Sequence, residues 1–323
     1  MKKVFVLGGT GFLGYFTIKE LLKRGYKVST LSLPPMPTED LLPNEVECRL
    51  GNINEMTDEE VLDLLKGVDG FVYAAGADER VVPDAPAVKF FYEANVLPTQ
   101  RLARLAKQAG VKKFVLYGSY FAHFAEVWTD LPLKDNAYPR TRLLQEEVAC
   151  MEGEGAMDVT TLRLPYIFGV MPGRMPLWTM FVDRVKDQKV IPVLGGGTAM
   201  VTAQQVAEAT IGAMEYGVHG GKYAICGMNM KHSEFHQMVA DALGQTDSTV
   251  TVMPLEQMKP AMEKLDAATA AAGKEHGIHM SVAVAAQDRD AYLDPEDTMP
   301  ILKYNEDDIR ASIVETLSKC VQG

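Results

Sequence analysis

The 323-residue sequence is poor in side chains that bind metals or form cross-links, with only four cysteines and six histidines. No two cysteines lie close together in the sequence, which excludes a zinc knuckle or a CxxC redox pair. His232 and His236 are four residues apart but do not form a His-Glu-x-x-His motif, so we expect no metal site. Scattered cysteines in a long chain are typical of a reducing compartment, and we expect a cytoplasmic protein.

Long apolar runs and an excess of basic residues are also absent. No segment approaches the roughly 20 apolar residues of a membrane-spanning helix, so we expect no membrane partner. The sequence has 43 acidic and 32 basic residues, and the net charge of −11 disfavours a nucleic-acid partner. The remaining composition is that of an ordinary globular protein, with 47% hydrophobic and 23% charged residues and enough length for about two domains.

The first 33 residues follow a β-α-β pattern. The apolar run 4–7 predicts a buried strand, the apolar spacing over 12–24 predicts a helix, and 27–33 predicts a second strand. Further strands are expected at 70–75, 113–117 and 159–164. Helices are expected between them at 57–67, 98–110 and 138–151. Strands that alternate with helices predict an α/β fold built on a doubly wound parallel sheet.

Glycines at positions 8, 11 and 14 occupy the turn between the first strand and the first helix. In a dinucleotide-binding turn, the first glycine permits the tight bend and the second lets the backbone approach a pyrophosphate. The third allows close packing of helix against strand. The helix N-terminus then offers free N–H groups to the anion. We therefore predict that a dinucleotide cofactor is bound by Gly8, Thr10, Gly11, Phe12, Leu13 and Gly14.

The end of the second strand indicates which dinucleotide binds. An acidic side chain there would accept hydrogen bonds from the adenosine ribose of NAD and repel the 2′-phosphate of NADP. The segment 28–33 contains neither an acid nor an arginine, and Ser32 occupies the discriminating position. The predicted cofactor is NADP(H) or NAD(H), and NADP(H) is favoured because nothing repels its phosphate.

The character of the sequence changes after about residue 165, where methionine, proline and glycine become frequent. We expect residues 1–165 to form a dinucleotide-binding (Rossmann) domain. Residues 166–323 are expected to form mainly a smaller substrate-binding lobe, with about 198–226 returning to the first domain. Four side chains are expected to cap helices: Thr57, Thr202, Ser233 and Asn305. The first two are followed three residues later by glutamate or glutamine, which predicts capping boxes.

These motifs resemble those of the extended or atypical short-chain dehydrogenase/reductase family, which includes nucleotide-sugar epimerases and 3β-hydroxysteroid-dehydrogenase-like enzymes. The glycine turn is similar to the family's TGxxGxxG variant, and residues 162–169 resemble its Leu-Arg segment near the nicotinamide. The resemblance covers most of the chain and is densest over residues 1–170. It implies further cofactor contacts from Asn52, Ile53, Ala74, Ala75, Gly76, Asn95, Tyr138, Arg142 and Pro165.

The resemblance also implies a catalytic helix on which a tyrosine and a lysine, four residues apart, share one face. In the family, the phenol exchanges a proton with the substrate oxygen, and the lysine lowers the pKa of that tyrosine. This sequence retains Tyr138 but has Arg142 in place of the lysine. Arginine keeps the positive charge and can bind the ribose, but it stays protonated and cannot pass on a proton. The family's catalytic hydroxyl falls on either Ser119 or Tyr120.

Apolar residues follow the segment expected near the nicotinamide. Met171 and Trp178 are expected either to pack in the core or to form an apolar wall for the substrate. Tyr166 occurs where sugar-nucleotide enzymes of the family tend to have asparagine, and the segment 195–201 lacks their diphosphate-binding arginine. A diphosphate requires charge-assisted donors, so an apolar substrate is favoured. His123 is expected either to face the substrate or to be a buried structural histidine.

Three functions are compatible with the sequence. The favoured one is an NAD(P)-dependent oxidoreductase that acts on a secondary alcohol or ketone of a fairly apolar small molecule. The second is a nucleotide-sugar epimerase or dehydratase on the same scaffold. The third is a non-catalytic NAD(P)-binding sensor or assembly protein, which the missing lysine suggests. The family resemblance also implies a homodimer formed through the helices expected at 98–109 and 138–151.

Overall fold

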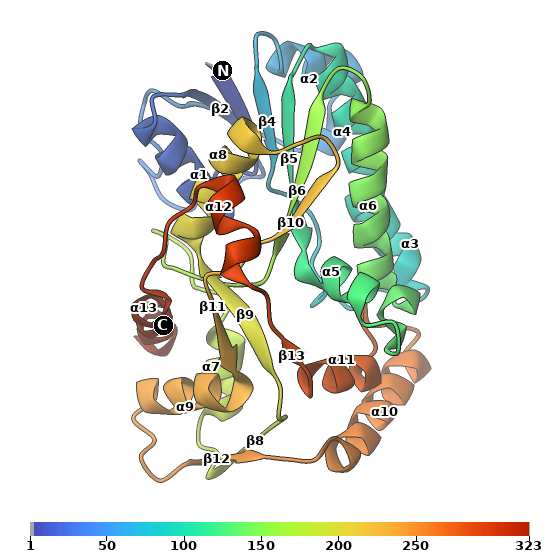
Figure 1. Cartoon of the computed structure of the whole chain (residues 1–323), viewed down its shortest axis with the longest axis vertical. Coiled ribbons are helices and arrows are strands. Elements are labelled where there is room, and N and C mark those ends of the chain that lie inside the picture. Colours follow the sequence, from blue (N-terminus) through green and yellow to red (C-terminus); the bar gives the residue numbers. More distant parts are fainter. Residues whose placement is uncertain (1–2, 323) are drawn as a thin grey trace.

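Seven parallel strands form the main sheet of the computed structural model, which describes residues 3–322 (Figure 1). Their order is β10-β6-β5-β4-β1-β2-β3, and every neighbouring pair is parallel. The strands are β1 (Lys3–Leu7), β2 (Lys27–Ser32), β3 (Glu47–Leu50), β4 (Gly70–Tyr73), β5 (Lys113–Ser119), β6 (Asp158–Leu164) and β10 (Gly221–Ala224). The predicted α/β fold with a doubly wound parallel sheet is confirmed.

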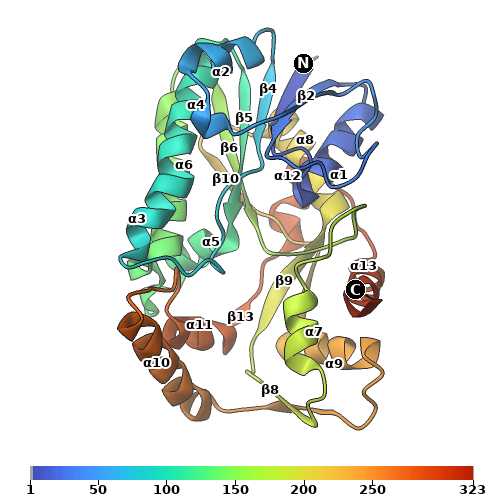
Figure 2. The same cartoon turned by 180° about the vertical axis from the view of Figure 1, so that it is seen from behind.

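Helices cover both faces of this sheet (Figures 1 and 2). The helices of one face are α1 (Phe12–Lys23), α8 (Ala203–Tyr216) and α12 (Met299–Leu302). The helices of the other face are α2 (Asp58–Leu64), α4 (Leu97–Gln108) and α6 (Ala137–Gly153). Successive side chains of β1 alternate between the two cores, with Val4 and Val6 in one and Phe5 and Leu7 in the other. Coverage on both faces explains why the central strands are continuous apolar runs.

A second sheet lies beyond the carboxyl ends of these strands and is centred on β9 (Gly197–Thr202) (Figure 1). Its other strands are β7 (Tyr166–Phe168), β11 (Met228–Lys231) and β13 (Asp290–Ala291), and β8 (Val190–Val193) pairs separately with β12 (Thr249–Val252). An apolar core joins this region to α7 (Thr179–Val185), α9 (His232–Ala242) and α13 (Ile309–Gln322). Among residues 3–322, no helix combines the length and the hydropathy needed to cross a bilayer.

Four further helices surround the region between the two sheets. They are α3 (Ala87–Phe91), α5 (Tyr120–Val127), α10 (Leu255–Ala271) and α11 (Met280–Gln287). In Figure 2, α10 and α11 lie directly below α3 and α5, although they come much later in the chain. The C-terminal segment therefore reaches back to the carboxyl edge of the main sheet.

The helix caps follow the sequence in two cases. Thr57 and Thr202 form complete capping boxes with Glu60 and Gln205, respectively, at the starts of α2 and α8. In both boxes the threonine side chain accepts from the N3 backbone N–H, and the N3 side chain accepts from the threonine N–H.

The other two caps were predicted wrongly, because tertiary contacts determine where those helices begin. Helix α9 begins at His232, before Ser233, and the His232 N–H donates to the Gly196 carbonyl at 3.0 Å. Asn305 lies well before α13 and instead donates to Glu208 through its backbone N–H and its Nδ2, at 2.9 and 2.8 Å. Both long-range contacts are invisible to a local sequence pattern.

Candidate active site

The glycine turn lies where the strand order of the main sheet reverses, between β1 and β4. Gly8 has a φ of +87°, and a Cβ atom there would stand 2.7 Å from the Ala74 carbonyl oxygen. A Cβ at Gly14 would stand 2.2 Å from the Gly8 carbonyl oxygen. The backbone is therefore too close for any side chain at either position. This switch point is where doubly wound sheets bind ligands.

Helix α1 begins immediately after this turn without a side-chain cap. Gly11 is its N-cap residue, and no side chain accepts from the first-turn N–H groups, which belong to Phe12, Leu13 and Gly14. These donors and the positive end of the helix dipole suit the pyrophosphate of a dinucleotide. The residues present therefore fit the predicted cofactor at this end of the site.

Ser32 holds the glycine turn in place. Its Oγ accepts from the Thr10 N–H at 3.0 Å, and Thr30 Oγ1 accepts from the Gly9 N–H at the same distance. Ser32 is buried, whereas the next residue, Leu33, is 63% exposed just beyond the end of β2. The side chain that faces solvent beside this strand end is therefore Leu33.

The other predicted cofactor residues gather at the carboxyl edge of the sheet. Asn52 follows β3 and caps the short 3-10 turn Ile53–Glu55, in which Ile53 is buried. Ala74 and Ala75 follow β4, and Pro165 follows β6. Parallel strands bring their carboxyl ends to one edge, so these residues share an edge with the glycine turn.

Asn95 fixes the loop that follows β4. It is fully buried in the π-helical turn Tyr92–Val96. Its Oδ1 accepts from the Ala77 N–H at 2.8 Å, and its Nδ2 donates to the Ala77 carbonyl at 2.9 Å. Gly76 has a φ of +140°, and a Cβ there would lie 2.7 Å from Asn95 Oδ1. The carboxamide thus holds this loop at the sheet edge through its backbone.

Tyr138 and Ser119 are brought together by α6 and β5. Tyr138 is only 3% exposed, and its ring packs edge-on against Phe91 at 5.4 Å. Ser119, the last residue of β5, lies close enough to the phenol of Tyr138 to lower its pKa, and its Oγ accepts from the Phe121 N–H at 3.2 Å. Tyr120 is held elsewhere, because its hydroxyl accepts from Thr198 Oγ1 at 3.4 Å. Ser119 is therefore the hydroxyl beside the phenol of Tyr138.

Arg142 lies one helical turn beyond Tyr138 and is also buried. Its Nη2 donates to the Tyr117 carbonyl, whereas its Nε has no hydrogen-bond partner within the described chain. A buried donor without a partner is costly, and a ribose hydroxyl would satisfy it. The observation fits the cofactor role predicted for this arginine.

The electrostatics of the site keep the phenol protonated at neutral pH. Burial raises the pKa of Tyr138 to about 12, while the positive charge of Arg142 and the nearby hydroxyl of Ser119 act in the opposite direction. Glu79 and Asp78 add to the rise. The phenol of Tyr138 therefore carries its proton at neutral pH.

The predicted substrate residues are only partly brought together. Tyr166 lies between Tyr120, at 6.3 Å between ring centroids, and Trp178, at 4.9 Å. Trp178 stacks on Phe168 at 4.4 Å and belongs to the apolar core around α7 and α9. Met171 is buried. His123 lies on α5, and burial lowers its pKa. The charge of Arg163 lowers this pKa further, whereas Glu126 and Asp297 act in the opposite direction.

Two groups of residues at this site were missed by the sequence reasoning. One is the charged loop that follows β4, Asp78-Glu79-Arg80. A run of charges after a buried strand, at the edge where such sheets bind ligands, was a usable signal. The other is the segment 272–279, which carried no motif.

The segment 272–279 fastens the C-terminal part of the chain to the start of α6. The Tyr138 N–H donates to the Gly277 carbonyl at 2.7 Å. The His279 N–H donates to Asn136 Oδ1 at 2.8 Å, and Glu275 Oε2 accepts from the Ala87 N–H at 2.7 Å. A Cβ at Gly277 would lie 2.7 Å from the Phe91 ring. This connection positions the helix that carries the phenol.

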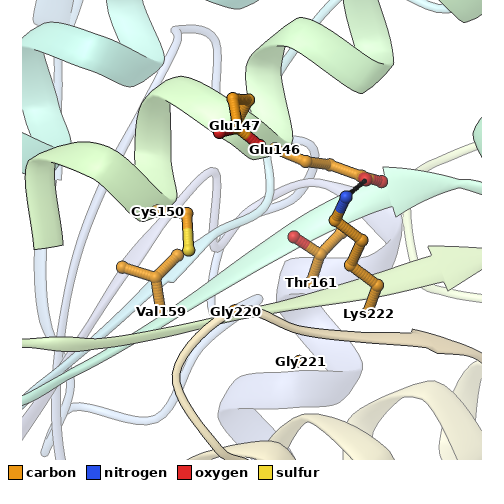
Figure 3. Close-up of a pocket in the computed structure, with 8 residues that line it drawn as sticks. All are labelled: Glu146, Glu147, Cys150, Val159, Thr161, Gly220, Gly221 and Lys222. Carbon is orange, nitrogen blue, oxygen red and sulfur yellow. Dashed lines mark ion pairs between the residues drawn. The ribbon is translucent and has the colours of Figure 1, made fainter. Parts of the chain in front are cut away.

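A network of charged side chains, centred on the buried pair Arg163 and Glu146, also holds α6 in place. Arg163 on β6 donates to both carboxylate oxygens of Glu146, at 3.0 and 2.7 Å, and to Glu126 at 2.6 Å. Lys222 on β10 lies 3.8 Å from Glu146, as Figure 3 shows. The ion pairs tie α6 to β6, β10 and α5, and a cavity of about 200 Å³ adjoins them.

Cys150 lines this cavity beside a histidine and a glutamate, as a catalytic cysteine does, but the histidine cannot act as its base. Its Sγ lies 3.4 Å from Nε2 of His219, and the same Nε2 lies 3.2 Å from Glu154. The Val159 N–H donates to His219 Nδ1, so the neutral ring carries its proton on Nε2 and cannot accept one from the thiol. Burial raises the pKa of Cys150. No cluster of three or more metal-ligating side chains occurs in residues 3–322.

The chain belongs to the NAD dependent epimerase/dehydratase family, whose model matches residues 4–226. This result confirms the resemblance inferred from the motifs. The human sterol-4-alpha-carboxylate 3-dehydrogenase, decarboxylating, is 28% identical over 210 residues, which are 62% of this chain and 53% of the human protein. The chain therefore spans about half the length of that relative.

A second relative is sterol demethylase protein B of Methylococcus capsulatus. It is 24% identical over 257 residues, and the alignment covers 77% of each chain. Among solved structures, the protein described as gox2253 superposes over 100% of this chain and 98% of its own with a TM-score of 0.77. At 19% identity, that similarity supports the fold alone.

Proposed function

We propose that this chain is an NAD(P)-dependent oxidoreductase that acts on a secondary alcohol or ketone of a fairly apolar small molecule. The arrangement of Tyr138, Ser119 and Arg142 at the carboxyl edge of the main sheet carries this proposal. All three side chains are buried there, beside loops that share the edge with the glycine turn.

Each of these side chains has a role in the proposed reaction. The nicotinamide ring, when bound, supplies or takes up a hydride. Tyr138 is protonated at neutral pH and donates its proton to the oxygen of a carbonyl substrate, while the Ser119 hydroxyl orients that oxygen. In the reverse direction the phenolate is needed, and the charge of Arg142 favours it. Arg142 Nε is available for a ribose hydroxyl.

The cofactor proposed is NADP(H) in preference to NAD(H). The last residue of β2, Ser32, is neutral and engaged with the glycine turn, and the exposed Leu33 beside it is also neutral. Neither residue would repel a 2′-phosphate. Neither of these two residues is a carboxylate that would select the ribose of NAD.

An apolar substrate is supported by the side chains around Tyr138. Its surroundings include Phe91, Phe124, Leu133 and Ile278, which form one apolar cluster. These side chains are buried and give the phenol an apolar setting, whereas a nucleotide diphosphate would need charge-assisted donors. The names of the two sterol-related proteins are in keeping with this substrate class.

The proposal is tested by the oxidation of NADPH in the presence of a panel of apolar cyclic ketones. Turnover by the unaltered protein that is lost in the Tyr138→Phe variant supports it. Turnover that persists in this variant removes the proposed mechanism. Tight cofactor binding without turnover of any ketone or alcohol would favour a sensor instead.

The dimer implied by the family is also retained as a proposal. Leu97 on α4 and Leu144 and Met151 on α6 are large apolar side chains exposed on neighbouring helices. Pairing of these helices with a second copy would cover them. Light scattering of the purified protein, compared with a Leu144→Glu variant, tests this pairing.

A further inference from the structure

Three consecutive helical segments join two parts of the candidate site. Helix α3, the π-helical turn that follows it and α4 run from residue 87 to residue 108 without a break. Two buried side chains on this stretch reach the site: Phe91 packs edge-on against Tyr138 at 5.4 Å, and Asn95 accepts from the Ala77 N–H at 2.8 Å. The placement of this stretch therefore affects both the proposed proton donor and the loop at the cofactor edge of the sheet.

A residue from the C-terminal part of the chain caps the start of this stretch. Pro86, the N-cap residue of α3, makes no side-chain hydrogen bond to the first turn. Instead, Oε2 of Glu275 accepts from the Ala87 N–H at 2.7 Å, across 188 residues of sequence. Ala87 is fully buried, so this N–H needs an acceptor from the protein. A carboxylate also interacts favourably with the positive end of a helix.

Backbone pairing fixes Glu275 in front of α3. The Glu275 N–H donates to the Pro83 carbonyl at 3.1 Å, and the Ala85 N–H donates to the Gly273 carbonyl at 2.9 Å, so the two segments pair in antiparallel fashion. The other carboxylate oxygen, Oε1, lies 3.2 Å from Nε2 of His279. Both oxygens of this carboxylate are therefore engaged, and its direction toward the start of α3 is set.

The same segment also holds the helix that carries the phenol. Two residues after Glu275, the Gly277 carbonyl accepts from the Tyr138 N–H at 2.7 Å. The backbone packs so tightly there that a Cβ at Gly277 would lie 2.7 Å from the Phe91 ring and 3.0 Å from Cβ of Tyr138. One short segment thus holds α3 through Glu275 and α6 through Gly277, and the two aromatic rings are fixed relative to each other.

We propose that Glu275 is a positioning residue, which caps α3 so that Phe91 packs against Tyr138 and holds its phenol in the direction needed for proton transfer. The assignment rests on the proposed oxidoreductase function. Glu275 acts through Phe91 and exchanges no proton with the substrate. Proton transfer requires the donor within hydrogen-bond reach of the substrate oxygen, so a small rotation of the ring lowers the rate more than it lowers binding.

Two variants of Glu275 in the full chain test the assignment. Glu275→Ala leaves the Ala87 N–H without its acceptor, and we expect kcat per folded molecule to fall about tenfold, with cofactor affinity and KM nearly unchanged. Glu275→Gln keeps an acceptor oxygen and should restore most of the rate. Glu208→Ala is the matched control, because Glu208 also accepts from a distant backbone N–H, that of Asn305, at 2.9 Å. It lies on α8, which covers the face of the main sheet opposite to α6, and should leave kcat unchanged.

The position of the phenol is also measured without turnover, by nuclear magnetic resonance of protein isotopically labelled at the Cζ atoms of its tyrosines. The Tyr138 signal is identified by its loss in Tyr138→Phe. We expect this signal to move in Glu275→Ala and to return in Glu275→Gln. An unmoved signal in Glu275→Ala, or equal losses of kcat in Glu275→Ala and Glu208→Ala, would overturn the assignment. A signal that moves, without any turnover by the unaltered protein, would support the positioning role and contradict the oxidoreductase function.

Discussion

The guanidinium carbon of Arg142 lies 5.6 Å from the centroid of the Tyr138 ring. The arginine is held there because its Nη2 donates to the Tyr117 carbonyl on β5. It therefore supplies a fixed positive charge to the phenol, as the family's lysine does, but it cannot release a proton at any ordinary pH.

Replacing Tyr138 with phenylalanine removes the proposed proton donor with little effect on packing. We expect kcat to fall by roughly 100-fold to 10,000-fold, the range typical of general acid–base catalysis. Cofactor affinity should stay unchanged, because the ring still packs against Phe91. Steady-state kinetics and cofactor titration measure both quantities. A loss of cofactor affinity equal to the loss of kcat would assign Tyr138 to binding instead.

Replacing Arg142 with methionine should raise the pKa of Tyr138 further, because the arginine charge lowers it. Alcohol oxidation requires the phenolate, so its pH–rate profile should shift to higher pH, with a loss of about tenfold or more at neutral pH. Arg140→Met, two residues earlier on the exposed side of α6, is the matched control. An unshifted pH–rate profile in Arg142→Met would show that the charge of Arg142 does not control the ionisation of Tyr138.

The charge beside the end of β2 should control cofactor choice. Leu33→Asp places a carboxylate at an exposed position, so the fold should be retained. We expect the Kd for NADPH to rise about tenfold through repulsion of the 2′-phosphate, with little change for NADH. Fluorescence titration with both cofactors checks this prediction. Parallel changes for the two cofactors would show that the adenosine ribose lies elsewhere.

The ion pair of Glu146 and Arg163 should be important for stability. The two side chains are 0% and 4% exposed, so Glu146→Gln leaves a buried guanidinium without its bidentate partner. Breaking a buried pair in this way costs about 3 kcal/mol of unfolding free energy. The neighbouring Glu147→Gln, at an exposed position, should be neutral. Urea unfolding of the two variants measures the difference, and equal stabilities would contradict it.

His232 should make the protein less stable in mild acid. Burial lowers the pKa of this histidine from 6.5 to about 4, so the unfolded chain binds the proton first as the pH falls. The neutral histidine is tolerated fully above pH 6.5. Between that value and about pH 4, its protonation in the unfolded chain lowers the free energy of unfolding by roughly 3 kcal/mol. A His232→Gln variant should lose this part of the pH dependence in urea unfolding. Identical pH slopes for both proteins would exclude the assignment.

Local patterns were sufficient for the nucleotide-binding half of the fold. The glycine turn, five of the seven strands of the main sheet and two capping boxes depend on residues close in sequence, and these were predicted. The helix caps at Ser233 and Asn305 failed because Gly196 and Glu208, distant in sequence, compete for the backbone. The edge strand β3 (Glu47–Leu50) was missed because its mostly exposed residues carry no apolar pattern.

The candidate site was predictable only in part for a similar reason. Tyr138 and Arg142 share one helix, so their spacing revealed them. Ser119 could not be separated from Tyr120 until the structure showed which hydroxyl meets the phenol. The charged loop Asp78-Glu79-Arg80 follows Ala77, whose backbone is held by Asn95, a contact between residues far apart in the chain. Such a contact leaves no periodic signal in the sequence.

The hydrogen bond from the Tyr138 N–H to the Gly277 carbonyl can form only late in translation, because it joins α6 to a segment near the end of the chain. The ribosome delivers β10, which completes the main sheet, well before Gly277 emerges. A nascent chain can therefore acquire its nucleotide-binding half while the N-terminal end of α6 still lacks its anchor. Helix α12, which covers one face of the same sheet, emerges later still, so the proposed catalytic competence should arrive last during translation.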